Sequence, residues 1–341
     1  MTDAHLRSSL RCDIDLSAQG KAHGFVRLPH SVHRSAYGWI PIPIVRIANG
    51  PGPSVLLVAG NHGDEWDGQI ALSKLINALD AHHICGRLVI LPGANFPATQ
   101  AGLRTSPIDD GNLNRLFPGD PAGTVSQQIA FWIEHVLLPG FDVSLDLHSG
   151  GSSLCYLPST LAYRVPDPQW MVRTLELINA FGAPVANIVA SPPSAGRSFT
   201  SASLRQGVLS IATEIGGGGQ VSIASLAAME SGIRSVLSHV GMLKDAPATP
   251  AKPPTRLTTV PGDSHYVYAS EAGLFEPLAH IGQQVHAGQS AARIHRHDSP
   301  WREPELLSFK ADALVICQRV PTLCARGDCL YQLASDTTIA A

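Results

Sequence analysis

The chain has 341 residues, of which 44% are hydrophobic and 15% charged, with a formal net charge of −3 and an isoelectric point near 6.6. A globular chain of this length buries one large core or two smaller ones. It lacks the excess of basic residues that nucleic acids and anionic membranes require of a binding protein, so we expect neither as a partner. A small molecule is the expected substrate.

The start of the chain, MTDAHLRSSLRCDIDL, carries charges where a signal peptide needs an unbroken apolar stretch, and no run of 18 apolar residues follows. We therefore expect a cytoplasmic protein, whether monomer or homo-oligomer. The cysteines form no Cys-x-x-Cys pair, which favours free thiols, with a Cys324–Cys329 bond as the alternative. The six are Cys12, Cys85, Cys155, Cys317, Cys324 and Cys329.

Apolar runs typical of strands alternate with helical patterns through the first two thirds of the chain. In chain order we predict strand 54–59, helix 65–79, strand 87–91, helix 125–138, strand 142–147, helix 171–181, strand 208–213 and helix 223–240. This alternation predicts an α/β fold with a doubly wound, mostly parallel mixed sheet. The active site of such a sheet lies at the carboxyl ends of its strands.

A Pro/Ala-rich stretch at residues 246–256 has no hydrophobic periodicity and divides the chain. Before it, residues 1–245 carry the α/β pattern. After it, short β-branched runs separated by turns predict a small all-β domain over residues 257–341. The boundary therefore predicts two domains joined by a linker.

The first predicted strand leads into His62 and Glu65, at a turn where a helix begins near Asp64. A histidine and a carboxylate three positions apart across such a turn can face one point, as two ligands of a tetrahedral zinc ion do. The alternative is a surface helix capped by Asp64.

A further histidine, His148, follows the predicted strand 142–147 and precedes small residues, Ser149 to Gly151. Small neighbours leave one side of a metal open, as in catalytic rather than structural zinc sites. By itself His148 is equally well explained as a hydrogen-bonded histidine at a strand end. Asp146 faces the same side of the strand and either orients a ligand imidazole or is an ordinary buried carboxylate.

Glu214 stands at the end of the strand 208–213 and precedes four glycines, Gly216 to Gly219. A carboxylate beside a zinc-bound water accepts its proton and passes it to a leaving amine. The glycines allow close approach of a substrate. A phosphate-binding loop is the alternative, but neither the Gly-x-Gly-x-x-Gly spacing nor a following Gly-Lys-Ser/Thr is present.

Two arginines, Arg104 and Arg115, lie in a long irregular stretch between the second and third predicted strands, and Asn114 precedes the latter. A guanidinium group pairs with a carboxylate in two parallel hydrogen bonds, and one near a metal stabilises an oxyanion. Solvated surface arginines are the alternative. The remaining histidines have no partner at ligand spacing, and we expect them to be surface or core residues.

Four motifs together resemble the succinylglutamate desuccinylase/aspartoacylase family of the zinc carboxypeptidase superfamily. They are GNHGDE at 60–65, NLNR at 112–115, DLHSG at 146–150 and TEIGG at 213–217, in the family's order. The resemblance implies a zinc carboxypeptidase-like fold with a zinc amidohydrolase domain, often followed by a small β domain. It implies one zinc per chain, bound by His62, Glu65 and His148. It also implies that Glu214 is the general base and acid and that Arg104 supports the oxyanion. Asn114 and Arg115 would bind the substrate carboxylate, with Arg197 as the candidate second substrate arginine.

The segment 23–44 and the chain length are most similar to the subgroup of N-acetyl-L-2,4-diaminobutyrate deacetylases of ectoine degradation. That resemblance implies a small N-acyl amino acid as substrate. Asp109 and Asp110 lie close in sequence to Arg115, so either is a candidate to meet a substrate ammonium group; the alternative is two solvated loop carboxylates. Alternatives are a deacylase of another N-acyl amino acid, of the aspartoacylase or desuccinylase kind, or a metallocarboxypeptidase. A lipoyl-like carrier is a non-enzyme alternative, but its attachment lysine is missing between the two glycine-containing halves until Lys310.

Overall fold

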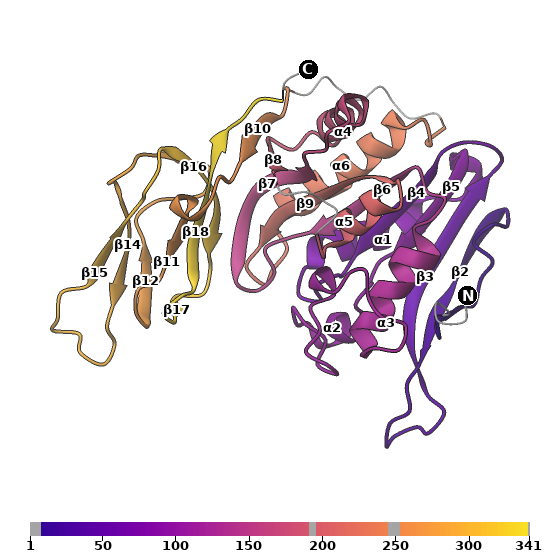
Figure 1. Ribbon diagram of the computed structural model, residues 1–341, viewed down its shortest axis with the longest axis horizontal. Helices are drawn as coiled ribbons and strands as arrows, with labels where there is room; N and C mark the ends of the chain where they lie inside the picture. The colour runs from indigo at the N-terminus through magenta and orange to yellow at the C-terminus, as the bar shows by residue number, and fades with distance from the viewer. Residues whose placement is uncertain (1–7, 191–195, 245–252, 340–341) are drawn as a thin grey trace.

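One long mixed β-sheet runs through the molecule (Figure 1). The computed structural model describes residues 8–190, 196–244 and 253–339. The strand order is β1 (Arg11–Cys12), β2 (Gly20–Pro29), β3 (Trp39–Asn49), β5 (Gly86–Leu91), β4 (Ser54–Ala59), β6 (Val143–His148), β9 (Leu209–Gly217), β7 (Leu154–Tyr163), β8 (Val185–Val189), β10 (Arg256–Thr259), β18 (Cys329–Asp336), β16 (Ala313–Arg319) and β13 (Gln284–Val285).

The expectation of a mostly parallel sheet is not confirmed, because only part of the sheet is parallel. Strands β5, β4, β6 and β9 run parallel to one another, whereas β3 and β7, which flank them, are antiparallel to their neighbours β5 and β9. The reason lies in the connections. A parallel crossover needs a dozen residues or more, and only 149–153 separate β6 from β7, so β7 runs back in the opposite direction.

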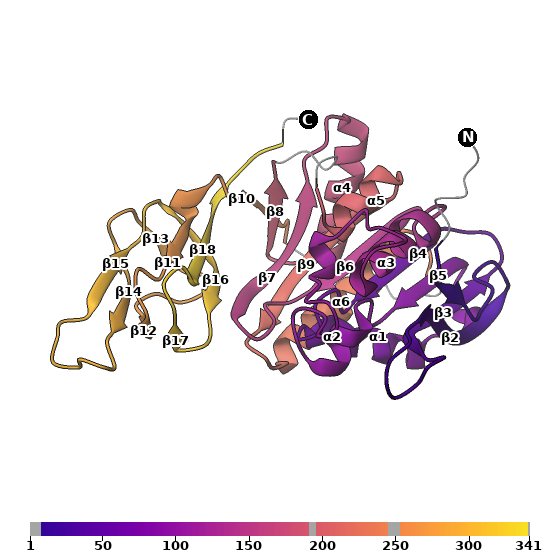
Figure 2. The same cartoon turned by 60° about the horizontal axis from the view of Figure 1, so that its bottom comes forward.

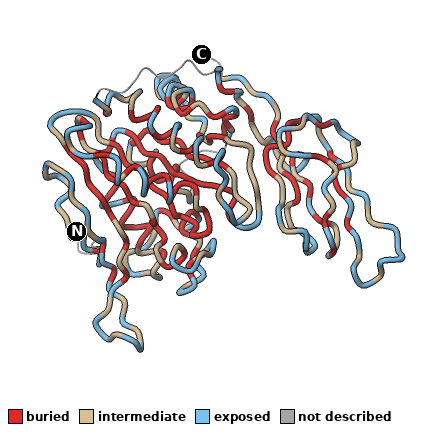
Figure 3. Tube along the Cα trace, turned by 180° about the vertical axis from the view of Figure 1, so that it is seen from behind, coloured by how far each residue is buried: buried red, intermediate tan, exposed pale blue. Residues whose placement is uncertain are grey.

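Helices cover both faces of the central strands. On one face lie α1 (Trp66–Ala78), α4 (Pro168–Phe181) and α6 (Ile223–His239); on the other lie α3 (Val125–Trp132) and α5 (Phe199–Arg205). Alternate residues of β4 explain this packing, since Val55 and Leu57 join the first layer and Leu56 and Val58 the second. Figure 3 shows the resulting concentration of buried residues along the central strands.

The predicted strands and helices of the first two thirds are confirmed to within a few residues. The largest differences are at β9, which continues to Gly217 where the prediction ended at residue 213, and at the helix predicted over 125–138, where α3 passes into a π turn at Ile133–Leu137. A short helix, α2 (Phe96–Ala101), and a 3-10 turn, Leu113–Arg115, interrupt the stretch after β5.

The C-terminal strands form a lobe of their own at one end of the molecule (Figure 2). A second sheet there has the order β15 (Glu305–Ser308), β14 (Ser290–His295), β12 (Gly273–Pro277) and β17 (Leu323–Cys324), and β11 (Tyr266–Tyr268) pairs with β18. The lobe has its own core, in which Tyr331 packs edge-to-face against Phe275 and Phe309.

The long sheet nevertheless continues from the α/β part into this lobe. Strand β10 pairs with β8 on one side and β18 on the other, and β16 pairs with β7. Of the predicted linker 246–256, residues up to 252 lie outside the described residues. All six cysteines are free, as expected, and the alternative Cys324–Cys329 bond is absent. Within the described ranges, no helix is long and apolar enough to cross a bilayer.

Candidate active site

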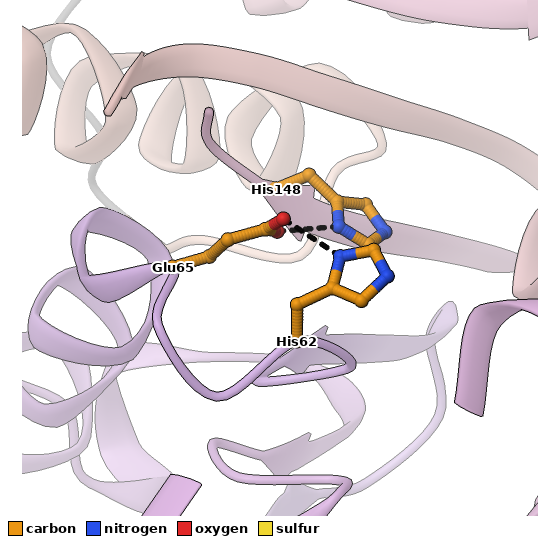
Figure 4. A group of neighbouring side chains, drawn as sticks. All are labelled: His62, Glu65 and His148. Carbon is orange, nitrogen blue, oxygen red and sulfur yellow. Dashed lines mark hydrogen bonds and ion pairs between the residues drawn. The ribbon is translucent and has the colours of Figure 1, made fainter. Parts of the chain in front are cut away.

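His62, Glu65 and His148 converge at the carboxyl ends of β4 and β6 (Figure 4). One ligand atom from each lies within 4.8 Å of the others, and all three residues are buried. The Nδ1 atoms of His62 and His148 each lie 2.6 Å from an oxygen of Glu65, Oε1 and Oε2 respectively. Two imidazole nitrogens and a carboxylate that meet at one point fit a zinc ion with a fourth position left for water or substrate.

Local chain geometry brings these residues together. Parallel β4 and β6 are neighbours in register, so Ala59 lies opposite Leu147 and both chains leave the sheet at the same edge. The tight turn from β4 into α1 requires a glycine at position 63, because an added Cβ would lie 2.0 Å from the Ala98 carbonyl oxygen.

Each imidazole also has a polar partner on its other nitrogen. Nε2 of His62 lies 3.1 Å from Asn112 Oδ1, and Nε2 of His148 lies 2.9 Å from Asp146 Oδ2. Such partners fix the orientation of a ligand imidazole and leave Nδ1 to the metal. Sequence reasoning assigned Asn112 no role, although the residue opens the NLNR motif and its position in that motif was the available signal.

Two of the three convergent groups, Glu65 and His148, have strongly shifted pKa values. Burial alone would raise the pKa of Glu65, but His148 and His62 outweigh it and hold that pKa well below its usual range. Burial likewise lowers the pKa of His148, whereas Asp146 and Glu65 raise it well above its ordinary value. Because ligand imidazoles must be deprotonated, metal binding here releases protons.

Glu214 stands beside this group, since parallel β9 places it opposite His148 of β6. Burial, and after it the charge of Glu65, raises the pKa of Glu214 to about 8. Its Oε2 is buried, and no described group donates a hydrogen bond to it. A carboxylate with a pKa near neutrality and a free oxygen is suited to accept and return a proton.

Arg104 reaches the same group from the solvent side. Its Nη1 lies 3.3 Å from Glu65 Oε1 and 3.4 Å from His62 Nδ1, and 47% of its side chain is exposed. The guanidinium group is thus close enough to stabilise negative charge that develops next to the three ligands.

Asn114 is buried and connects three elements. Its Oδ1 accepts a 2.7 Å hydrogen bond from the backbone N–H of Phe199 at the start of α5, and its Nδ2 lies 3.1 Å from His148 Nε2. Arg115 donates to the Asn114 carbonyl oxygen at 2.8 Å. Asn114 thus fixes the loop that carries Arg115.

Arg115 and Arg197, 82 positions apart in the chain, line one cavity together with His148 and Glu214. Its volume is about 260 Å³. In the described part of the chain neither arginine forms an ion pair with a carboxylate, so both guanidinium groups are available to a ligand. Sequence reasoning missed Tyr163, whose hydroxyl lies 3.2 Å from Ser198 Oγ in the cavity wall.

Asp109 and Asp110 do not line this cavity, contrary to the role suggested for them. The Asp109 carboxylate is occupied, because it accepts hydrogen bonds from the backbone N–H and the hydroxyl of Ser126 at 2.7 and 2.9 Å. Asp110 is an exposed turn residue with φ of 54°. Both carboxylates therefore belong to the loop structure.

Comparisons with known proteins agree with this geometry. Residues 51–240 match the family described as the succinylglutamate desuccinylase/aspartoacylase catalytic domain. The N-alpha-acetyl-L-2,4-diaminobutyric acid deacetylase of Halomonas elongata is 40% identical over 327 residues, which are 96% of this chain and 95% of that protein.

Two solved structures superpose on the chain with a TM-score of 0.91. A succinylglutamate desuccinylase/aspartoacylase from Rhodobacter sphaeroides is 38% identical, with 97% of this chain and 100% of that one covered. The product-bound ectoine utilization protein EutE (DoeB) from Ruegeria pomeroyi is 37% identical, with 96% and 99% covered.

Proposed function

Because the chain belongs to the succinylglutamate desuccinylase/aspartoacylase family, we propose that it is a zinc-dependent deacetylase that hydrolyses N-acetyl-L-2,4-diaminobutyrate to diaminobutyrate and acetate. The observation that carries the chemistry is the convergence of His62, Glu65 and His148 beside Glu214. The substrate is taken from the 40% identical deacetylase, with which this chain shares nearly its whole length.

His62, Glu65 and His148 would hold a zinc ion, which would supply Lewis acidity and lower the pKa of water to about 7. Glu214 accepts the proton of the attacking water and returns it to the amide nitrogen as the amine leaves. The Arg104 guanidinium stabilises the negative charge that develops on the carbonyl oxygen.

Arg115 holds the substrate carboxylate in our proposal, with Arg197 as a second donor and Asn114 fixing the loop. The supporting observation is that both guanidinium groups line the cavity and lack a carboxylate partner among the described residues. A planar guanidinium binds a carboxylate through two parallel hydrogen bonds, which orient the amide toward the metal ligands.

The size of the cavity favours a small substrate over a peptide. Its volume of about 260 Å³ lies just below the range of roughly 300–1,000 Å³ found for pockets that hold drug-sized ligands. We therefore place the enzyme among amidohydrolases of N-acyl amino acids rather than among carboxypeptidases.

The presence of two arginines favours a second candidate within the same family. A cavity lined by two guanidinium groups that lack a carboxylate partner among the described residues also suits a substrate with two carboxylates, such as N-acetylaspartate or N-succinylglutamate. The two candidates differ in the charge of the substrate side chain and share all of the chemistry.

We further propose that residues 1–245 act as the catalytic domain, 246–256 as a linker and 257–341 as a small β domain. The pairing of β16 with β7 supports a role of the C-terminal part in holding the strand next to β9.

A side-by-side assay tests the proposal. The zinc-loaded protein is expected to hydrolyse 2-acetamido-4-aminobutanoate with a higher kcat/KM than N-acetylaspartate or N-succinylglutamate. A preference for either dianionic substrate would contradict the proposed substrate and leave the zinc chemistry standing. Absence of amide hydrolysis with all three would contradict both.

A further inference from the structure

The proposed substrate has a charge that the residues assigned so far leave unpaired. Its side-chain amine is protonated at neutral pH, since primary amines have pKa values near 10.4. Arg104, Arg115 and Arg197 all repel it. A carboxylate that faces the cavity is therefore needed to select this substrate over one of the same shape without the charge.

Most acidic residues near the site are already occupied. Glu65 contacts both metal-facing imidazoles, and Glu214 carries the proton in the proposed reaction. Asp109 is bonded to Ser126, and Asp110 is exposed outside the cavity wall. Among the described residues that line the cavity, Asp146 is the one remaining carboxylate, and the contact that we have described for it is with the His148 imidazole.

Asp146 lies in the floor of the cavity. Strand register puts it beside Ala212 of β9, which in turn lies opposite Leu161 of β7, and all three residues line the cavity. Only 1% of Asp146 is exposed. The short side chain of Ala212 fills little of the space next to the carboxylate.

The two oxygens of Asp146 differ in their partners. Oδ1 accepts a 2.6 Å hydrogen bond from Asn61 Nδ2. Oδ2 is buried and lies 2.9 Å from His148 Nε2, and within the described ranges no second group contacts it. A carboxylate oxygen has two lone pairs, so Oδ2 can stay next to His148 and still accept from another cation.

We propose that Asp146 Oδ2 receives the ammonium group of the substrate side chain and so selects a basic N-acyl amino acid. The inference rests on the proposed function and adds the residue that discriminates the side chain. An ammonium group there adds a charge-assisted donor to a carboxylate that is only 1% exposed.

The test compares two substrates of nearly equal shape, 2-acetamido-4-aminobutanoate and 2-acetamidopentanoate. The second substrate has a methyl group in place of the ammonium group of the first. The wild-type enzyme is expected to prefer the amino substrate in kcat/KM by at least about tenfold, the factor that corresponds to one charge-assisted contact. Asp146→Asn, which keeps the shape, is expected to lose most of that preference. Asp109→Asn, a matched change at a carboxylate outside the cavity, is expected to keep it.

The ratio of kcat/KM for the two substrates distinguishes a residue that selects the ammonium group from one that only supports the structure of the site. If Asp146 only positions His148, the variant loses activity on both substrates equally and the ratio stays as in wild type, which would overturn the inference. If wild type itself shows no preference for the amino substrate, the proposed substrate is wrong and the inference falls with it.

A variant without turnover is still informative through product binding. The affinities of 2,4-diaminobutyrate and 2-aminopentanoate are then measured by calorimetry on wild type and Asp146→Asn, both without zinc. A wild-type preference that disappears in the variant supports the inference, and an unchanged preference overturns it.

Discussion

At the residue scale, the chemistry depends on side chains that are each held from two directions. His62 and His148 present Nδ1 to Glu65 and keep Nε2 against Asn112 and Asp146. Contacts on both ring nitrogens restrict the side-chain conformation of each histidine before a metal binds, so binding the metal loses less conformational entropy.

Replacing His62 or His148 by alanine is expected to remove most of the zinc, because each variant keeps only two of the three proposed protein ligands. Elemental analysis of dialysed protein should show about one zinc per chain in wild type and far less in both variants. His295→Ala is the control, since His295 pairs with Glu276 in the C-terminal lobe. Full zinc occupancy in both variants would contradict the proposed site.

Replacing Glu214 by glutamine is expected to leave zinc bound and to lower kcat by about 10² to 10⁴, the usual contribution of a positioned acid-base group. Glu230→Gln serves as control, because Glu230 pairs with Lys74 between α6 and α1. A kcat close to that of wild type would exclude Glu214 from the proton transfer.

The raised pKa of Glu214 also predicts how the stability of the metal-free protein depends on pH. Its pKa is about 8 in the folded state against 4.5 ordinarily, so the native state holds this proton more tightly than the unfolded state. The contribution of Glu214 to stability is therefore full below pH 4.5 and declines as pH rises toward 8. Glu214→Gln, which cannot ionise, should gain in Tm relative to wild type over that range; parallel Tm curves would contradict this.

At the scale of elements, the turn between β4 and α1 determines whether the metal ligands meet. Gly63→Ala is expected to destabilise the protein by about 1–3 kcal/mol and to weaken zinc binding, because the new Cβ would collide with the backbone of Ala98. Gly93→Ala is the matched control, since its Cβ would meet nothing closer than 3.6 Å. Urea unfolding measures both, and equal stability of the two variants would argue against a tight turn at Gly63.

At the scale of the whole molecule, the C-terminal lobe completes the main sheet. Strands β10 and β16 cover β8 and β7, and Leu314 and Ile316 pack with Val185 of the α/β part. A chain ending at Lys244 is therefore expected to expose unpaired strand edges and to aggregate or melt earlier than the full chain. Size-exclusion chromatography and thermal melting measure this. A monomeric fragment with the full-length Tm would contradict it.

The sequence by itself was sufficient for features that depend on neighbouring residues. The strand at 54–59 was predictable because a nearly continuous apolar run of that length buries both faces of a strand, and the strand at 142–147 because its apolar residues recur at every second position. The four motifs indicated the family, and with it the candidate metal ligands, since each motif spans at most six consecutive residues and three of the four lie at the end of a strand. Free cysteines followed from spacing alone.

Only the tertiary structure decided which distant groups meet. Arg197 joins Arg115 at one cavity, Asp146 faces that cavity while Asp109 does not, and Asn112 supports His62. The mixed direction of the sheet and its continuation into the C-terminal lobe belong here as well. These facts depend on strand register and on contacts across many intervening residues, and a one-residue shift in register would reverse the face that each side chain occupies. Local sequence patterns do not determine that register.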